Sequence, residues 1–320
     1  MKWISPKKLR ELGILGMNSR NIDYIGRSND RRLFPLVDDK LKTKRLAEKF
    51  GMAVPQLFAV INNQHDIQTL ENQLSGRDQF VIKPAQGSGG KGILVIAERV
   101  GDQYIKSSGP ALKLRDIKHH ATNILSGLYS LGGRPDVVMI EDMIVFDPIF
   151  SQYSYEGVPD IRVIVYKGYP VMAMLRCSTH ASDGKANLHQ GAVGVGLDIN
   201  TGKSLFAVQN NIKIEKHPDT GFSFDQLVIP NWDHILQLAS HCYEMVGLGY
   251  FGADIVLDKN KGPMILELNA RPGLAIQVAN QTGLTKRLQH IDQHILAMTH
   301  DVEARIALAK QWFANSLRKA

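Results

Sequence analysis

The stretch 254-DIVLDKNKGPMILELN-269 decides both the fold and the chemistry of this chain. Two apolar runs typical of buried strands flank turn-forming residues, which predicts a β-hairpin. A turn symmetric about residues 260 and 261 places Asp254 opposite Glu267, with Asn269 two positions along on the same face. Like charges opposed in this way destabilise a hairpin. Two carboxylates and an amide oxygen suit Mg²⁺, which needs few protein ligands when phosphates supply the rest.

Two other interpretations of this hairpin stay open at this point. A register shift of one residue would move Glu267 to the opposite face. Alternatively, both acids point to solvent and repel each other weakly. The presence of Asn269, followed by 270-ARPG-273, favours the functional interpretation.

A second motif is the glycine-rich segment 84-PAQGSGGKG-92, between strands predicted over residues 80–83 and 92–97. It satisfies G-x-G-x-x-G, but dinucleotide-binding and P-loop motifs need a helix after the loop, and 93-ILVI-96 favours a strand. A strand–loop–strand arrangement is typical of a flap that covers phosphates with backbone N–H groups. Lys83, just before the loop, can direct a cation to the same phosphates. A glycine-rich hairpin without a ligand is the alternative.

Protein kinases also have a glycine-rich loop between two strands. The chain contains neither their His-Arg-Asp catalytic loop nor their Asp-Phe-Gly motif, so a kinase is excluded.

Composition narrows the class of protein further. The chain has 320 residues, 44% hydrophobic and 22% charged, which excludes a disordered chain, a collagen-like fibre and a disulfide scaffold. Its two cysteines, Cys177 and Cys242, are too few for a disulfide framework or a cysteine-based zinc site. No apolar run approaches the roughly 20 residues needed to span a bilayer. We therefore expect a cytoplasmic protein without a transmembrane segment.

The net charge of +7 lies in one part of the chain. Residues 1–49 contain 13 Lys and Arg against 6 Asp and Glu, and the remainder contains 25 of each. A basic face that tracks a nucleic-acid backbone is therefore not indicated. The basic N-terminal segment is predicted to be solvated, with an acidic partner or a membrane surface as alternatives.

The other patterns indicate α+β architecture. Helices are predicted over residues 39–50 and 232–246, an apolar run covers 137–144, and a hairpin joins 161–166 to 171–176. Apolar residues from Leu288 to Leu317 recur at helical spacing and predict one or two C-terminal helices that pack on the main body. This mixture of hairpins and helices argues against an alternating doubly wound sheet.

In order and spacing, these elements resemble the ATP-grasp superfamily, from about residue 38 to residue 289. The likeness rests on 80-FVIKP-84 with its glycine loop, 140-IEDMI-144, 160-DIRV-163, 252-GAD-254 and 266-LELNARPG-273. Within the superfamily, 35-PLVDDK-40 and 271-RPGLAIQVAN-280 are similar to RimK-like and alpha-L-glutamate ligase-related proteins.

The resemblance implies an ATP-grasp fold, with two α+β lobes and the nucleotide between them. Residues 1–35 are then a short basic N-terminal extension. Residues 36–290 form the ATP-grasp domain, with a flap lobe at about 80–145, and residues 291–320 form a C-terminal helical tail.

The resemblance also implies roles for individual residues. Two lysines, Lys40 and Lys83, would contact the ATP phosphates. The flap over the phosphates would consist of Gly87, Ser88, Gly89, Gly90, Lys91 and Gly92. The hinge that reads the adenine edge would consist of Glu141, Asp142, Met143 and Ile144. Arg162 and Arg176 resemble the arginines that face the γ-phosphate or acyl-phosphate. Asp254, Glu267 and Asn269 are similar to the Mg²⁺ ligands. Arg271 would hold a substrate carboxylate.

The function that this implies is an ATP-dependent, ADP-forming carboxylate–amine ligase that adds glutamate or another amino acid through an acyl-phosphate. Its cofactors would be ATP and Mg²⁺, with Mn²⁺ as an alternative, and its substrates a small-molecule or peptide carboxylate and an amine. A catalytically silent ATP-binding scaffold is the alternative function. The acid, the amine and the oligomeric state stay undetermined by the sequence.

The chain departs from the family pattern in two places. Only about 35 residues precede the ATP-grasp core, where relatives carry a full α/β domain. Gly252 stands where some relatives carry an arginine, so that Arg176 or Arg271 would have to compensate. Among the remaining residues, His119 and His120 are predicted to be a surface pair, Cys242 to be in the core, and His189 to be a candidate for substrate contact.

Overall fold

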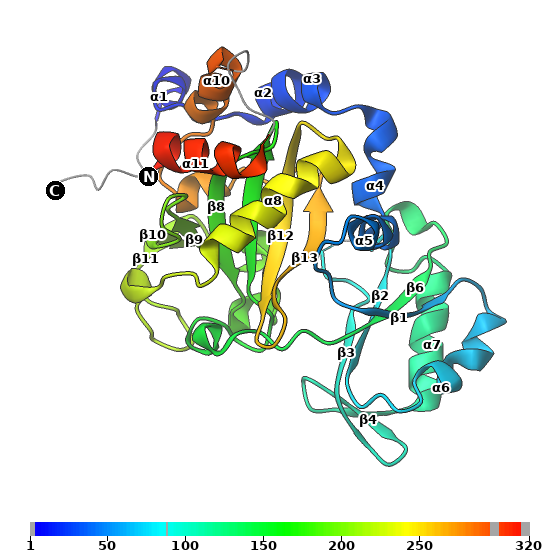
Figure 1. Cartoon of the computed structure of the whole chain (residues 1–320). Helices are drawn as coiled ribbons and strands as arrows, with labels where there is room; N and C mark the ends of the chain where they lie inside the picture. The colour runs from blue at the N-terminus through cyan, green and yellow to red at the C-terminus, as the bar shows by residue number, and fades with distance from the viewer. Residues whose placement is uncertain (1–3, 88, 295–300, 315–320) are drawn as a thin grey trace. The chain divides into compact units, whose positions relative to one another are not determined.

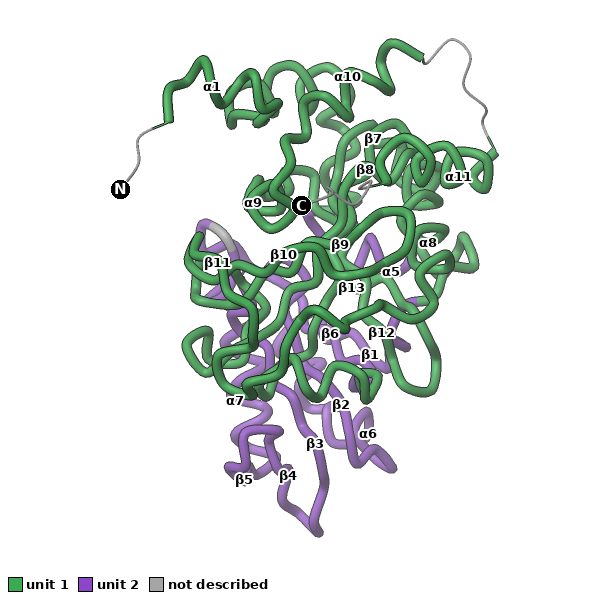
Figure 2. The backbone as a smooth tube through the Cα atoms, turned by 90° about the vertical axis from the view of Figure 1, so that its left-hand side faces the viewer, with its two compact units in different colours: residues 1–37, 46–53, 146–320 green, residues 38–45, 54–145 purple. Residues whose placement is uncertain are grey.

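The computed structural model describes residues 4–87, 89–294 and 301–314, and it has the predicted α+β architecture (Figure 1). It contains two sheets in which every strand pair is antiparallel. The chain forms two compact units (Figure 2): unit 1 comprises residues 1–37, 46–53 and 146–320, and unit 2 comprises residues 38–45 and 54–145.

Unit 1 is built on a seven-stranded sheet with the order β11-β10-β9-β8-β7-β12-β13. Its strands are β7 (Asp160–Tyr166), β8 (Tyr169–Cys177), β9 (Val193–Leu197), β10 (Ser204–Gln209), β11 (Ile212–Ile214), β12 (Tyr250–Asp258) and β13 (Gly262–Asn269). All of β12 is buried, since helices and neighbouring strands cover it. The helices are α8 (Trp232–Val246), α9 (Ile276–Ala279), α10 (Thr285–His294) and α11 (Val302–Phe313).

The predicted elements of unit 1 are confirmed, with small changes at their ends. The hairpin of β7 and β8 turns at Lys167 and Gly168, both at positive φ. Helix α8 has the predicted bounds and ends at Gly247, whose φ of 69° suits glycine at a helix C-terminus. The predicted C-terminal helices are α10 and α11; the apolar positions Ile295, Met298 and Leu317 lie outside the described residues.

The N-terminal segment of unit 1 consists of short helical turns: α1 (Pro6–Glu11), α2 (Met17–Ser19), the π-helix η1 (Arg20–Ile25), α3 (Gly26–Ser28), η2 (Arg31–Leu33) and α4 (Pro35–Asp38). Tyr24 packs edge-on against Tyr166, with ring centroids 5.5 Å apart. The Asn29 amide exchanges two hydrogen bonds with the backbone of Tyr250. The N-terminal segment therefore shares buried contacts with the seven-stranded sheet of unit 1.

Unit 2 contains a six-stranded sheet with the order β1-β6-β2-β3-β4-β5. Its strands are β1 (Leu57–Ile61), β2 (Phe80–Pro84), β3 (Leu94–Val100), β4 (Gln103–Lys106), β5 (Ala111–Lys113) and β6 (Val138–Glu141), and its helices are α6 (Leu70–Gln73) and α7 (Leu114–Leu125). Helix α5 (Lys40–Lys49) contributes its first residues to unit 2. Apolar side chains from α6, α7 and the sheet form one core, which includes Leu70, Phe80, Ile82, Ile117 and Ile140.

Two strands of unit 2 differ from the predicted ranges. β3 begins at Leu94, not at residue 92, because Gly92 has a φ of +76° that does not belong to a strand. β6 covers only part of the apolar run 137–144: it ends at Glu141, and the N–H of the next residue, Asp142, donates to the Gln56 carbonyl.

Candidate functional site

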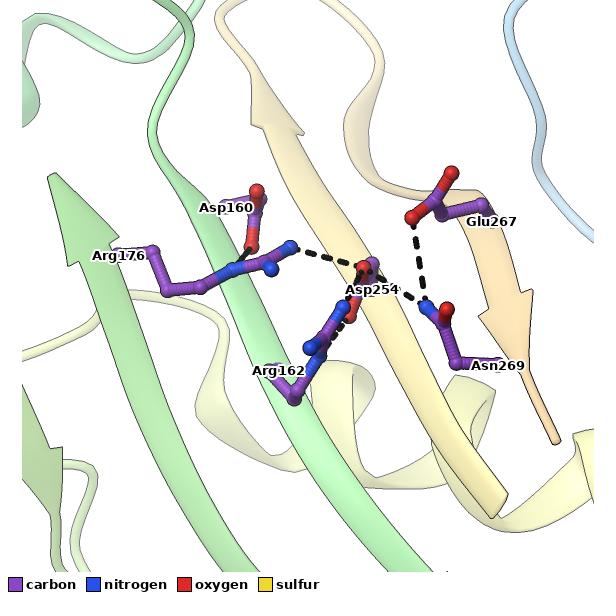
Figure 3. Close-up of polar contacts among 6 residues, drawn as sticks. All are labelled: Asp160, Arg162, Arg176, Asp254, Glu267 and Asn269. Atoms are coloured by element: carbon purple, nitrogen blue, oxygen red, sulfur yellow. Dashed lines mark hydrogen bonds and ion pairs between the residues drawn. The ribbon is translucent and has the colours of Figure 1, made fainter. Parts of the chain in front are cut away.

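The β12–β13 hairpin brings together the three predicted metal ligands. Asp254 pairs with Glu267, and Gly252 pairs with Asn269, so the two carboxylates lie opposite each other as expected. The Asn269 Nδ2 donates to Asp254 Oδ2 at 3.2 Å and to Glu267 Oε1 at 3.3 Å (Figure 3). These three side chains therefore form one polar cluster on a single face of the seven-stranded sheet.

The predicted register is right near Asp254 but wrong near the turn. Ile255 pairs with Ile265 and Asp258 with Gly262, so the turn is centred on residue 260 alone. The register shifts between Asp254 and Ile255, which leaves Leu266 as an extra residue on β13. Such a β-bulge redirects the side chains that follow it. Without it, Glu267 would lie on the other face of the sheet.

Two arginines from the β7–β8 hairpin complete the cluster. Arg162 donates through Nε to Asp254 Oδ1 at 2.7 Å and through Nη2 to Asp254 Oδ2 at 2.5 Å. Arg176 spans two carboxylates: its Nε donates to Asp160 at 2.6 Å and its Nη2 to Asp254 at 2.8 Å (Figure 3). The pairings of Asp160 with Arg176, and of Arg162 with Asp254, place these side chains on neighbouring strands.

Burial and charge act in opposite directions on these groups. Burial alone would raise the pKa of Asp254, but Arg162 and Arg176 outweigh it and lower that pKa to about 2. Burial raises the pKa of Asp160 to about 6, because the single close guanidinium of Arg176 does not fully offset it. Burial disfavours the charge of Arg176, yet Asp160 and Asp254 raise its pKa above the usual range. The two arginines therefore keep Asp254 ionised near pH 7.

The donor set fits a hard divalent cation with one adjustment. Among the described residues, no group of three or more His, Cys, Asp or Glu side chains is arranged to hold a metal. Two carboxylates and an amide nevertheless meet here. Asp254 Oδ1 accepts a hydrogen bond from Arg162, whereas Oδ2 accepts from Arg162, Arg176 and Asn269. The amide presents its nitrogen to the acids, so cation binding requires Asn269 to turn its oxygen inward. Glu267, Asn269 and Asp254 Oδ1 are then oxygen ligands of the kind that Mg²⁺ prefers.

Unit 2 contains a separate buried charge cluster. Lys44 and Lys83, each 5% exposed, form ion pairs with Glu141, which is 2% exposed. The Lys44 Nζ lies 2.9 Å from Glu141 Oε2, and Lys44 also donates to the Pro55 carbonyl. Burial alone would raise the pKa of Glu141, but Lys83 and Lys44 lower it below its usual range. The Glu141 side chain is therefore occupied by two lysines.

The predicted phosphate-binding residues of unit 2 lie around the glycine loop. Lys40 donates through Nζ to the Gly87 carbonyl at 2.7 Å. Gly87 is buried, Gly89, Gly90 and Lys91 are exposed, and Ser88 lies outside the described residues. The expected hinge residues Asp142, Met143 and Ile144 directly follow β6 and are partly buried.

Arg271, the predicted carboxylate-binding residue, is exposed and stacks on an aromatic ring. Its guanidinium lies 4.6 Å from the centroid of the Phe34 ring, and this cation–π contact joins Arg271 to the N-terminal segment of unit 1.

Sequence analysis missed two members of these clusters, Asp160 and Lys44. The turn at 167-KG-168 alone would pair Asp160 with Leu175, and a register shift between Ile164 and Val165 brings Asp160 opposite Arg176 instead, so local sequence contained no signal for this pair. Lys44 lies one helical turn after Lys40 on α5, so both lysines project from similar faces. Cys242, in contrast, is buried as predicted, and its Sγ donates to the Leu238 carbonyl.

Comparisons with known proteins give one matching family model and one curated relative, and each covers most of this chain. A family model described as sugar-transfer associated ATP-grasp matches residues 19–293. A curated protein, the probable alpha-L-glutamate ligase of Maridesulfovibrio salexigens, is 23% identical over 236 residues, which are 74% of this chain and 56% of that protein. This chain therefore spans little more than half the length of that relative.

Solved structures with a similar arrangement include two ligases. The D-alanine–D-alanine ligase from Bacillus anthracis has a TM-score of 0.47 and 14% sequence identity, covering 94% of this chain and 78% of its own. The ATP-grasp ligase PsnB, complexed with a minimal precursor, has a TM-score of 0.44 and 15% identity, covering 82% of this chain and 60% of its own. Among the described residues of the present chain, no helix is both long and apolar enough to cross a membrane.

Proposed function

This chain belongs to the sugar-transfer associated ATP-grasp family, and from that premise we propose that it is an ATP-dependent carboxylate–amine ligase that releases ADP. One observation carries the proposal: Asp254, Glu267 and Asn269 converge on one sheet face, where Arg162 and Arg176 hold Asp254. Buried carboxylates packed against guanidinium groups form a preorganised charged site of the kind that phosphoryl transfer requires.

The proposed reaction has two steps. A carboxylate oxygen of the first substrate attacks the γ-phosphorus of ATP, and the bond to the bridging β,γ-oxygen breaks, which releases ADP and leaves an acyl-phosphate. The nitrogen of an amine then attacks the acyl carbon, phosphate leaves, and the nitrogen loses one proton. The name of the curated relative suggests L-glutamate as the first amine to test.

In unit 1, we assign the cation to Asp254, Glu267 and Asn269. When bound there, Mg²⁺ would neutralise phosphate oxygens. Arg162 and Arg176 would stabilise negative charge on the transferred phosphoryl group, and Asp160 would orient Arg176 through its Nε. The three acids and two arginines carry a net charge of −1, so one divalent cation makes the site positive and suited to an anionic substrate.

In unit 2, we assign nucleotide binding to the lysines and the glycine loop. Lys83 and Lys40 would contact phosphates, and backbone N–H groups of Gly89, Gly90 and Gly92 would supply further donors. Lys44 shares Glu141 with Lys83. Glu141 would then hold Lys83 in place, while the backbone of residues 142–144 reads the adenine edge.

Exclusion of water from the site is part of the proposal, because water would hydrolyse the acyl-phosphate.

Arg271 is assigned to a substrate carboxylate, since the planar guanidinium matches that group and its stacking on Phe34 fixes the guanidinium plane. A scaffold that only binds ATP would have no turnover, and it would not need Arg271 or a site closed to water.

The test is ADP release from Mg²⁺-ATP in the presence of pooled carboxylates and amines, with L-glutamate tested first and the product identified by mass. We expect release that depends on both pools. Nucleotide binding without substrate-stimulated ADP release would contradict the ligase proposal and favour a scaffold.

A variant pair tests the metal assignment in the same assay. Glu267→Ala should abolish Mg²⁺-dependent ADP formation while the far-UV circular dichroism spectrum stays unchanged. Glu303→Ala, at an exposed position in the first turn of α11, is the matched control and should keep full turnover. Unchanged turnover in Glu267→Ala would remove the metal assignment.

A further inference from the structure

The glycine loop of unit 2 is held firmly at its first end. Gly87 is buried and forms an isolated antiparallel bridge with Ser130. The hydroxyl of Ser130 donates to Asp136 at 2.6 Å, and the same carboxylate accepts from the backbone N–H of Gln86. Lys40 donates to the Gly87 carbonyl from α5. The beginning of the loop is therefore fixed by several independent contacts.

The other end of the loop depends on two side chains. The His120 Nε2, on α7, lies 2.9 Å from the Gly92 carbonyl oxygen. A carbonyl oxygen only accepts, so this nitrogen carries the proton and donates. The Tyr129 ring lies directly beneath Gly92, because a Cβ built there would meet Tyr129 Cδ2 and Cγ at 2.6 Å. The His120 and Tyr129 rings pack on each other, with centroids 5.5 Å apart and planes tilted by 36°.

Gly89 and Gly90, which lie between these two ends, have much less support. Gly89 and Gly90 are exposed, with φ values of +63° and +75°, and a Cβ added at Gly89 would meet nothing within 4 Å. Glycines at positive φ have wide conformational freedom, so local sequence does not fix the direction of their N–H groups. The conformation of this segment is therefore set by its anchored ends.

His120 has the electrostatic surroundings of a permanent donor. Burial lowers the pKa of its imidazole, the bond to Gly92 opposes this, and nearby Lys106 and His119 lower the pKa further. The ring is thus neutral near pH 7, with its proton on the nitrogen that faces Gly92. The prediction that His119 and His120 form a surface pair is wrong for His120, which is partly buried, whereas His119 is exposed.

We propose that His120 and Tyr129 are positioning residues that fix the Gly92 end of the glycine loop, so that its backbone N–H groups are preorganised for the phosphates of ATP. The proposal rests on the proposed function, since it takes this loop to be the phosphate-binding element. Without the two side chains the loop would sample more conformations, and the apparent association constant for nucleotide would fall in proportion to the fraction of molecules with a binding-competent loop.

A pair of substitutions at one position separates the hydrogen bond from general packing. His120→Gln keeps an N–H donor at a similar reach, whereas His120→Met fills a similar volume without a donor. Both variants lose the ring. The measurement is isothermal titration calorimetry with a non-hydrolysable ATP analogue and Mg²⁺, alongside hydrogen exchange of residues 86–93. His119→Met, at the exposed neighbouring position, is the matched control.

We expect His120→Met to weaken nucleotide binding by about three- to tenfold, the effect of one lost hydrogen bond. Hydrogen exchange at Gly92 should rise in the same variant. His120→Gln should lie within about twofold of the unsubstituted protein, as should His119→Met, and thermal unfolding should be similar for all. A merely structural histidine would not be rescued by glutamine in both readouts.

The contrary outcomes are distinct. If the unsubstituted protein binds nucleotide and His120→Met binds equally well, the positioning role is wrong and the proposed function stands. Equal losses for His120→Gln and His120→Met would also overturn it, because the donor would then be irrelevant. If the unsubstituted protein binds no nucleotide, the proposed function fails and this inference fails with it.

Tyr129 provides a second, steric test in the same binding assay. Gly92→Ala should weaken nucleotide binding more than His120→Met does, because the new Cβ forces Tyr129 out of place and the positive φ is strained. Gly76→Ala is a control at positive φ with open space around it. Nucleotide binding by Gly92→Ala equal to that of Gly76→Ala would overturn the role of Tyr129.

Discussion

Replacement of Glu141 by glutamine tests the charge cluster of unit 2 most sharply. The change keeps the side-chain size but removes the single negative charge between Lys44 and Lys83, all three groups being at most 5% exposed. Two buried ammonium groups would then face each other without a counter-charge. We expect a large loss of stability confined to unit 2.

The magnitude follows from the geometry. At 2.9 Å and an effective dielectric constant of about 20, the Lys44–Glu141 attraction is about 6 kcal/mol. Desolvation of the charged groups offsets part of this attraction, so the measured loss on breaking a buried pair is usually about 3–5 kcal/mol. Lys44→Met should cost less than Glu141→Gln, because it leaves a neutral Lys83–Glu141 pair. In the double variant Lys44→Met/Glu141→Gln the two losses of stability should not add, since methionine removes one of the two ammonium groups that Glu141→Gln leaves without a counter-charge.

The effect should also depend on pH, with a definite sign. Lys83 and Lys44 hold the pKa of Glu141 below its usual range, so the folded carboxylate contributes stability at pH values above the unfolded pKa, about 4.3. That contribution is lost as the pH falls through the lower folded pKa. The stability difference between the unsubstituted protein and Glu141→Gln should therefore be constant near pH 7 and shrink below about pH 4.

Native-state hydrogen exchange read at β2 and β6 reports the opening free energy of unit 2. Glu71→Gln, at an exposed position on α6, is the control and should change that free energy by less than about 0.5 kcal/mol. A loss below about 1 kcal/mol for Glu141→Gln near pH 7, or costs that add in the double variant, would refute the reasoning.

Two further predictions concern unit 1. Gly283→Ala should destabilise the protein by about 2 kcal/mol or more in urea unfolding, because the new Cβ would lie 1.9 Å from the Gly13 carbonyl oxygen. The control Gly16→Ala, whose Cβ meets nothing within 4 Å, should be tolerated. Equal urea midpoints for the two variants would contradict the close packing of the N-terminal segment. Arg176→Lys keeps the charge but loses the fork that spans Asp160 and Asp254, so kcat for ADP formation should fall by about tenfold or more, and an unchanged kcat would exclude a role for the fork.

Hairpins were the most predictable part of the fold. The runs that form β7 with β8, and β12 with β13, are apolar and separated by short turn-forming segments, so sequence alone indicated which strands pair, although each hairpin contains a register shift that it did not indicate. The opposition of Asp254 and Glu267 was correct partly by compensation: the turn is one step shorter than expected, and a bulge at Leu266 restores the register. A bulge depends on tertiary packing and leaves no clear local signal.

The contacts that sequence reasoning missed join segments far apart in the chain. The bond from His120 to Gly92 joins α7 to the glycine loop across 28 residues, and no local pattern encodes it. The prediction of a solvated N-terminal extension is wrong for Leu15 and Tyr24, which are buried. Their partners, such as Gln277 and Tyr166, lie more than 100 residues away in the chain, so no local pattern indicated this burial. Local periodicity predicts elements, whereas such contacts are set by their assembly.

The most direct test of the central claim is transfer of labelled oxygen. Once a carboxylate substrate is found, it is supplied with ¹⁸O in both carboxylate oxygens, together with Mg²⁺-ATP and the amine, and the released nucleotide and phosphate are analysed by mass spectrometry. If ATP phosphorylates the carboxylate, one ¹⁸O atom enters each inorganic phosphate released and the nucleotide product is unlabelled ADP. Label in AMP, or phosphate without label, would contradict the acyl-phosphate route and with it the role assigned to the Asp254 cluster.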